Sequence, residues 1–468
     1  MNAFFLVLSM TIVATSSAVD MTKPPEAAPM RAVKLPPRSQ WQLKNGLTVV
    51  LVTDRRVPLI TGRLSVRGGA AAVAAEDAGL AEAVAELLTD GTARKTSKEI
   101  SDAAELFGGS IAASAGPDTI VLSASALAEK ADAMASLMAE VIRTPIFPEA
   151  EVALRKANMK EELEASRAES DFLAGVVFHK KIFSGHPYAV TAPTDDSIQR
   201  LERETVGAAA KRLLTPHGAL LVLVGDISKE DAQALVEKYF GSWAGGPAAQ
   251  DAPPLTAKKA ERTIYLFDRP KSSQVSFLFG NQVVREDHPS YFDLLIANQV
   301  LGGSFSSRLV RDIRESKGYT YNIGSRFEHR LSGSLLRIRT PVRNEVAEPA
   351  LAAILAHLDA LHRKDVTDDE LKQAKTYLAG SFARSLETQD GVADAVLKLK
   401  QLRLPDDWYD SYVDNVQAVS AAGARRAAEN FIRPDELTIV AVGDAAKVKD
   451  ALAKFSARPI VAVDQDGN

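Results

Sequence analysis

An internal repeat constrains the fold of this chain more than any other feature of its sequence. The segment Pro216–Asp226 reads PHGALLVLVGD, and 218 residues later Pro434–Asp444 reads PDELTIVAVGD. Each copy has a proline, then a run of leucine and β-branched residues typical of a strand, then Gly-Asp. An expected helix precedes each copy, and another follows it and ends near Phe240 or Phe455. Because the spacing repeats the strand together with its flanking helices, we expect two copies of one domain.

The boundaries of the two domains follow from a segment typical of a linker. Residues 244–261 combine Gly, Pro and Ala with little hydrophobic periodicity, so we interpret them as a linker between residues 39–243 and 262–468. In the first domain, the Asn45-Gly46 pair separates two strand-like runs and predicts a hairpin. The mixture of strand and helix runs in each half predicts an α+β fold, with an antiparallel-rich sheet covered by helices.

The N-terminus predicts export from the cytoplasm. An apolar run over residues 4–14 is followed by small residues, so we interpret residues 1–18 as a secretory signal peptide and expect a periplasmic protein. Residues 19–38 are rich in Pro, Ala and Met and are typical of a flexible lead-in. No later segment is apolar enough to predict a membrane span. A net charge of −4 with no basic run argues against a nucleic-acid partner.

The fourteen-residue segment Gly79–Thr92, GLAEAVAELLTDGT, carries the first candidate site. Leu80, Val84, Leu87 and Leu88 recur at the spacing of an amphipathic helix. On such a helix three further positions, 82, 85 and 86, lie close together on a different face.

This segment resembles the active-site segment of the M16 (pitrilysin/insulinase-like) zinc peptidases. In that family the middle of the segment reads H-x-x-E-H, in which two histidines bind zinc and the glutamate is the general base. The three positions are Glu82, Ala85 and Glu86 here, so the scaffold is present and the ligands are missing. We therefore predict a chain with no catalytic residue of its own, no bound metal and no cofactor.

The remaining residues do not predict a substitute zinc site. The chain has no cysteine, and none of its seven histidines forms an H-x-x-H or H-x-x-x-H pair. We favour the interpretation that Glu82 and Glu86 are solvated surface residues, because a hard cation between them needs about six to eight oxygen ligands. The family's third ligand is a glutamate on a later helix. A glutamate cluster near the matching position is either its remnant or an ordinary charged helix face: Glu161, Glu162 and Glu164.

The resemblance extends over about residues 40–456. It includes FSGHPYAVTAPTDDSI at Phe183–Ile198, DDELKQAKTYLAGSFARSLET at Asp368–Thr388 and both Gly-Asp strands. It implies two homologous M16-type α/β-roll domains, joined by the linker, that close like a clamshell.

The second half carries the other candidate site, in Val300–Ser325. The pattern predicts a helix that ends at Gly318, followed by a strand over Tyr319–Ile323, so that Arg314 and Tyr321 lie near each other. A guanidinium and a phenol there suit the carbonyl groups of an extended peptide. The alternative is structural, since an arginine favours a helix C-terminus and a strand tyrosine often only packs. In the M16 family a matching Arg and Tyr, seven residues apart, bind substrate beside the zinc, so the resemblance makes this pair substrate-binding.

A first half without ligands and a second half with an Arg/Tyr pair are together similar to one subunit of the heterodimeric bacterial M16 peptidases. The leading hypothesis is therefore a non-catalytic, substrate-binding subunit of a periplasmic zinc metallopeptidase. Its partner would carry H-x-x-E-H and supply the zinc and the general base for cleavage of peptides or unfolded segments. The alternative hypothesis is a pseudo-peptidase that acts as a homo-oligomeric peptide-binding or scaffolding protein.

Overall fold

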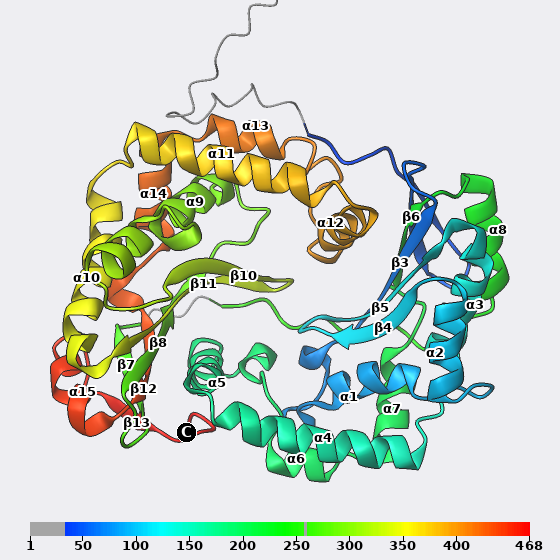
Figure 1. Ribbon diagram of the computed structural model, residues 1–468, viewed down its shortest axis with the longest axis horizontal. Coiled ribbons are helices and arrows are strands. Elements are labelled where there is room, and N and C mark those ends of the chain that lie inside the picture. The colour runs from blue at the N-terminus through cyan, green and yellow to red at the C-terminus, as the bar shows by residue number, and fades with distance from the viewer. Residues whose placement is uncertain (1–32, 257–259) are drawn as a thin grey trace, which may run out of the picture. The chain divides into compact units, whose positions relative to one another are not determined.

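The computed structural model describes residues 33–256 and 260–468, which form a mixed α/β structure with two separate β-sheets (Figure 1). The expected signal peptide, residues 1–18, lies outside the described residues, as do residues 19–32 of the expected lead-in.

The first sheet has six strands in the order β1-β2-β6-β3-β5-β4. All neighbouring pairs are antiparallel except β2 with β6, which are parallel. β1 and β2 form the hairpin predicted at Asn45-Gly46, and Gly46 has the positive φ of 90° that favours glycine at the turn. The strands are β1 (Ser39–Gln42), β2 (Thr48–Thr53), β3 (Leu59–Arg67), β4 (Ser110–Ala115), β5 (Thr119–Leu127) and β6 (Leu220–Gly225).

The second sheet repeats this arrangement over five strands, and it differs at the edge, where β13 is parallel to β7, and in an additional strand, β9, that pairs with β11. Its order is β10-β11-β8-β12-β7-β13, and β12 is parallel to β7 and antiparallel to β8, as β6 is to β2 and β3. The two Gly-Asp strands of the sequence repeat, β6 and β12, hold the same position in their sheets, which confirms the repeat. The strands are β7 (Thr263–Asp268), β8 (Gln274–Gly280), β9 (Gln282–Val283), β10 (Gly324–Arg330), β11 (Gly333–Arg343), β12 (Thr438–Gly443) and β13 (Val461–Val463).

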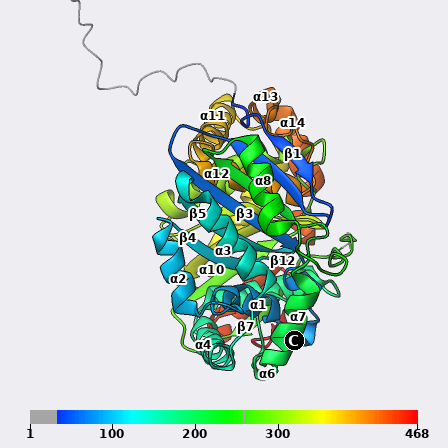
Figure 2. The same ribbon diagram turned by 90° about the vertical axis from the view of Figure 1, so that its right-hand side faces the viewer.

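Helices of the first half cover one face of the first sheet. Figure 2 shows α3 and α8 in front of this sheet, and both pack on its strands and on each other. The α-helices of this half are α1 (Leu80–Glu86), α2 (Ser97–Leu106), α3 (Ala131–Arg143), α4 (Glu149–Arg167), α5 (Ser170–Ile182), α6 (Asp195–Gln199), α7 (Arg203–Leu213) and α8 (Lys229–Phe240). Its short 3₁₀ turns are η1 (Ala70–Ala72), η2 (Ala75–Asp77), η3 (Leu87–Thr89), η4 (Ala128–Lys130) and η5 (Pro187–Ala189).

Helices of the second half cover the second sheet in the corresponding way, with α10 packed against α14 and α15. The α-helices are α9 (Tyr291–Asn298), α10 (Ala347–Arg363), α11 (Asp368–Ser385), α12 (Gln389–Gln401), α13 (Tyr412–Ala418), α14 (Ala421–Phe431) and α15 (Ala445–Ala453). Two π-helical turns, η6 (Gln299–Gly303) and η7 (Val310–Ser316), follow α9, and two 3₁₀ turns are η8 (Asn344–Val346) and η9 (Pro434–Glu436).

One helix of each half packs on the sheet of the other half. Helix α12 packs on β3 and β6 of the first sheet, where Val392 and Val396 share a core with Val222 and Val224. Helix α5 packs on β8 and β12 of the second sheet, where Phe178 joins the residues of those strands in a further core (Figure 1). Each sheet carries apolar side chains, many of them β-branched, on both faces. Helices of its own half cover one face, and the helix from the other half covers the second face.

The segment between the halves is bound to both of them. Asp251 forms ion pairs with Arg67 of the first half and Arg403 of the second. The described part of the expected lead-in, residues 33–38, is also attached: Leu35 is buried, and its backbone N–H donates to Asp410 Oδ1 at 3.2 Å. Within the described ranges, no helix combines the length and apolar character that crossing a membrane requires.

Candidate functional site

The first-half candidate positions lie on α1, which begins after Gly79. This glycine has a φ of +91°, and a Cβ there would lie 2.8 Å from Met159, so both the backbone and the packing favour glycine. The helix is buried on several sides, and Ala85 lies in the core of the first half. Glu86 is exposed, whereas Glu82 faces a pocket of about 200 Å³ between α1, α4 and the loop after η5.

The prediction that Glu82 is a solvated surface residue is wrong. Its Oε2 atom is buried and has no hydrogen-bond partner among the described residues. Burial, followed by the nearby charge of Glu86, raises the pKa of the Glu82 carboxyl above its usual value. The apolar stripe did not reveal this burial because residues of α1 are buried on more than one face, so the position beside the stripe is half-buried.

A guanidinium lies between the carboxylates of this pocket. Arg155 Nη1, from α4, is 2.8 Å from Glu86 Oε2 and 3.1 Å from Glu162 Oε1. Glu162 is therefore the member of the predicted glutamate cluster that reaches the pocket, whereas Glu161 and Glu164 are exposed on other faces of α4.

These residues do not fit a zinc ion. Zinc sites in proteins use imidazole, thiolate or carboxylate in tetrahedral geometry, and here a cationic guanidinium occupies the space between two of the carboxylates. No group of three or more His, Cys, Asp or Glu residues that could hold a metal ion occurs in residues 33–256 and 260–468. This chain therefore does not carry the zinc site of a peptidase.

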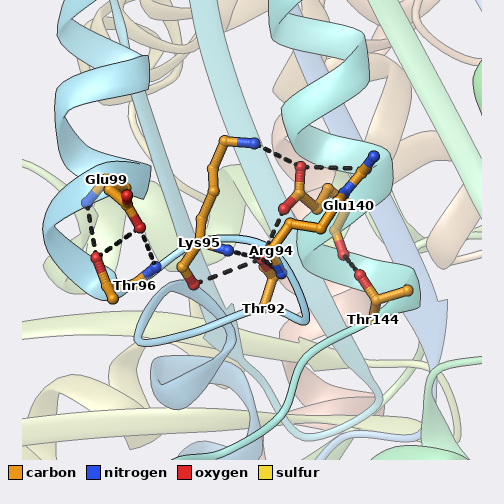
Figure 3. Close-up of polar contacts among 7 residues, drawn as sticks. All are labelled: Thr92, Arg94, Lys95, Thr96, Glu99, Glu140 and Thr144. Carbon is orange, nitrogen blue, oxygen red and sulfur yellow. Dashed lines mark hydrogen bonds and ion pairs between the residues drawn. The ribbon is translucent and has the colours of Figure 1, made fainter.

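The C-terminal end of the segment Gly79–Thr92 has a structural role (Figure 3). Thr92 Oγ1 donates to Glu140 Oε1 of α3 at 2.6 Å and accepts the backbone N–H of Lys95 at 2.9 Å. The Lys95 ammonium is 2.8 Å from Glu140 Oε2, and Arg94 is 3.3 Å from the same oxygen. Burial alone would raise the pKa of Glu140, but Lys95, Thr92 and Arg94 outweigh it and lower the pKa. This network joins the end of the segment to α3.

The second-half candidate site centres on Arg314 in η7. Its guanidinium carbon lies 4.7 Å from the ring centre of Phe305 and 4.8 Å from that of Tyr321, so it makes a cation–π contact with each ring. Phe305 is 65 % exposed and Tyr321 is 85 % exposed. The structure thus brings the predicted pair together and adds Phe305, which sequence reasoning missed.

The prediction of a strand at Tyr319–Ile323 is wrong. Gly318 has a φ of +61°, which ends the helical turn as predicted, but β10 begins only at Gly324. Thr320 explains the difference, because its Oγ1 accepts the backbone N–H of Asn322 at 3.1 Å and donates to the carbonyl of Pro341 at 2.5 Å. This side chain replaces a strand ladder with a local turn, which exposes Tyr321.

The segment that carries Arg314 is firmly held. Arg308 forms a bidentate pair with Glu370 of α11, with both N–O distances at 2.7 Å. Asp312 is hydrogen-bonded to His357 of α10 at 2.9 Å. Gly302 lies so close to β10 that a Cβ would be 2.7 Å from the backbone nitrogen of Ser325, so this close approach requires glycine. The π-helical turns η6 and η7 lie close together in the chain, and such turns are rare and occur frequently at functional sites.

The arrangement suits recognition of peptide carbonyl groups. Among the described residues, no hydrogen-bond or ion-pair partner contacts the Arg314 guanidinium, and the two rings leave its N–H donors available. Of the described aromatic residues, three are exposed, and Phe305 and Tyr321 are two of them (the third is Tyr377). Exposed aromatic groups beside an arginine are typical of binding surfaces.

The motif at Phe183–Ile198 joins the two halves of the chain. His186 accepts the backbone N–H of Tyr188 at 3.1 Å, and its other ring nitrogen is 2.7 Å from the carbonyl of Pro253 in the linker. The Tyr188 hydroxyl donates to Asp118 at 2.5 Å, and Asp118 also accepts the backbone N–H of Leu331 in the second half.

Comparison with known proteins agrees with this geometry. The profile of the insulinase family (peptidase family M16) matches residues 48–192, and the profile of the peptidase M16 inactive domain matches residues 200–378. A Bacillus subtilis protein named "uncharacterized zinc protease YmxG" is 23 % identical over 81 % of this chain and 92 % of its own length. The "non-peptidase homolog YmxG" of Helicobacter pylori is 22 % identical over 86 % of this chain and 93 % of its own length.

A solved structure described as a peptidase M16 inactive domain from Pseudomonas fluorescens is also similar to most of this chain. It superposes with a TM-score of 0.81 at 26 % identity, covering 87 % of this chain and 98 % of that chain.

Proposed function

Since this chain belongs to the M16 peptidase family and carries Glu82, Ala85 and Glu86 where that family carries H-x-x-E-H, we propose that it is the non-catalytic, substrate-binding subunit of a heterodimeric zinc metallopeptidase. Its partner is a second M16 chain that bears H-x-x-E-H. The substrates are peptides or unfolded segments, bound in an extended form.

One observation carries this proposal: Arg314 is held between two exposed rings on a segment that is itself tightly anchored. A buried structural arginine would have acceptors within its own chain, whereas this guanidinium has none among the described residues. An extended peptide offers carbonyl oxygens that can accept its N–H donors, and Tyr321 adds a phenol that can donate a further hydrogen bond.

In this proposal the two chains divide the chemistry. The partner supplies the zinc ion and the general base, which hydrolysis of a peptide bond requires. This chain binds the peptide and orients it, so its contribution is positional. Its own zinc-ligand positions hold a guanidinium instead of a metal, which favours dependence on a partner.

We place the complex in the periplasm. The support is the N-terminal sequence, whose apolar run followed by small residues is typical of a secretory signal. The name "non-peptidase homolog" of the Helicobacter pylori relative fits a chain that lacks the catalytic ligands.

Arg314→Ala tests the proposal in the purified complex with its partner. Loss of a charged hydrogen-bond donor to a peptide carbonyl corresponds to roughly 2 kcal/mol, so we expect kcat/KM for a fluorogenic peptide to fall about 10- to 100-fold. Size-exclusion chromatography should show an intact complex. Arg311→Ala, which removes an exposed arginine from the same π-helical turn, is the matched control and should leave kcat/KM within about twofold.

Unchanged cleavage by the Arg314→Ala complex would contradict the substrate-binding role. If the chain associates only with copies of itself and cleaves nothing, the alternative of a homo-oligomeric peptide-binding or scaffolding protein is favoured instead.

A further inference from the structure

The pocket beside α1 holds a cluster of charges that the proposed function does not use. Arg155 reaches from α4 toward two carboxylates that belong to different helices. Its Nη1 is 2.8 Å from Glu86 Oε2 and 3.1 Å from Glu162 Oε1, and its Nη2 is 3.2 Å from Glu162 Oε2. Only 14 % of the Arg155 side chain is exposed. One buried cation is therefore shared by α1 and α4.

The location of this cation is specific. Glu86 occupies the position of the second histidine of H-x-x-E-H, and Glu162 lies on the later helix, in the region where the family's third ligand is expected. Glu82, at the position of the first histidine, lines the same pocket. The guanidinium thus lies among the residues at the former ligand positions.

The negative charges of this pocket are balanced by Arg155. Two carboxylates that share one guanidinium nitrogen are close enough to repel each other when that nitrogen is removed, although solvent screens them because their side chains are 47 % and 60 % exposed. A divalent cation that approaches them would in turn be repelled by the guanidinium. The planar fork of an arginine also fixes the orientation of both carboxylates.

We propose that Arg155 is a built-in counter-cation that replaces the metal ion of the former site: it neutralises Glu86 and Glu162, fastens α1 to α4, and excludes divalent cations from the pocket. The absence of zinc then has two causes, the missing imidazoles and the guanidinium. This inference concerns the first half only and does not depend on the substrate-binding role of Arg314.

The test restores the ligands with and without Arg155. The restored chain carries Glu82→His, Ala85→Glu and Glu86→His, and a second version adds Arg155→Ala. Zinc affinity is measured by competition with a chromophoric chelator, and stoichiometry by elemental analysis of the purified chain. We expect the version with Arg155→Ala to bind one zinc ion per chain at least about tenfold more tightly than the version that keeps Arg155.

Arg167→Ala in the restored chain is the matched control. Arg167 lies on the same helix, is similarly buried at 18 % side-chain exposure, and pairs with Asp195 at 2.7 Å instead of with the pocket carboxylates. Its removal should leave zinc affinity unchanged. Equal affinity with and without Arg155, no zinc binding in either version, or the same gain from Arg167→Ala would each overturn the proposal.

A stability measurement keeps the proposal testable if the restored chains do not fold. Arg155→Ala in the native sequence should lower the melting temperature, because it removes the cation that two neighbouring carboxylates share and leaves them to repel each other. In a chain that already carries Glu86→Gln and Glu162→Gln, the same change should lower it by less than half as much. An equal decrease in both backgrounds would show that Arg155 is not the counter-cation of these carboxylates.

Discussion

At the scale of single residues, the two candidate sites have opposite characters. At the first, Arg155 pairs with Glu86 and Glu162, and the half-buried Glu82 lines the same pocket. At the second, Phe305 and Tyr321 are exposed, and the half-buried Arg314 between them has guanidinium N–H donors without a partner among the described residues. Ion pairs within the chain stabilise the fold, whereas polar groups without an internal partner beside exposed rings are available to bind another molecule.

Phe305 belongs to this exposed site and gives a prediction that sequence alone did not suggest. Phe305→Ala removes one of the two rings that hold the Arg314 guanidinium, and an exposed cation–π contact is worth about 0.5–1 kcal/mol. We expect KM for a peptide substrate of the complex to rise about two- to fivefold, with a smaller change in kcat. Steady-state kinetics measures this effect.

The control for Phe305 is Tyr377→Ala, which removes a comparably exposed ring that makes no contact with Arg314. An equal rise of KM in both variants would mean that the effect comes from lost surface area and not from the position of the guanidinium.

At the scale of elements, local sequence patterns predicted most of the architecture. The hairpin at Asn45-Gly46, the two Gly-Asp strands and the end of the helical turn at Gly318 are all present. The failures have identifiable causes. The predicted strand at 319–323 is absent because the side chain of Thr320 accepts the backbone N–H of Asn322 and forms a local turn. The π-helical turns were not predicted because they have no distinctive sequence period. Glu82 was misplaced because helix periodicity identifies one buried face and not a second.

The conformation of Gly318 can be tested by comparison with a glycine in an ordinary helix. A Cβ added at Gly318, or at Gly207 of α7, would have no other atom within 4 Å, so substitution by alanine tests the backbone alone. Gly318→Ala should destabilise the chain by about 1–2 kcal/mol because its φ is +61°. Gly207→Ala should stabilise it by about 0.5–1 kcal/mol because the residue lies within a helix.

Differential scanning fluorimetry should therefore give melting temperatures that shift in opposite directions for these two variants. A stabilising Gly318→Ala would mean that the turn after η7 does not adopt the left-handed conformation.

At the scale of the whole molecule, the described residues form one interlocked unit. The sequence repeat predicted two similar sheets, but it did not predict that α5 and α12 each cover the sheet of the other half. The periodicity of apolar residues predicts that a helix has an apolar face, but it does not predict which sheet that face covers. The same limit applies to Phe305, whose role depends on where a turn places it in space.

The contact between α5 and the second sheet predicts a dependence of stability on pH. Glu328 of β10 is hydrogen-bonded to His179 of α5 at 2.9 Å and to Arg337 of β11 at 2.7 Å. Burial alone would raise the pKa of Glu328, but His179 and Arg337 outweigh burial and lower it to about 2. Because this pKa is lower in the folded state, the ionised carboxylate stabilises the fold fully above about pH 4.5, and the stabilisation is lost as the pH falls toward 2.

The corresponding variant is Glu328→Gln, which cannot ionise. We expect it to lower the free energy of unfolding at neutral pH by an amount of the order of 2 kcal/mol, and to weaken the decrease of the melting temperature between pH 5 and pH 3. Glu161→Gln, at an exposed position of α4, should leave that pH dependence unchanged. An undiminished pH dependence in Glu328→Gln would contradict the assignment.

The measurement that tests the central claim most directly is affinity purification of the tagged chain from its native cells, with bound proteins identified and quantified by mass spectrometry. The account predicts an equimolar M16 chain that bears H-x-x-E-H, together with peptidase activity that a zinc chelator abolishes. Recovery of this chain alone, without peptidase activity, would contradict a role as the substrate-binding subunit of a split peptidase.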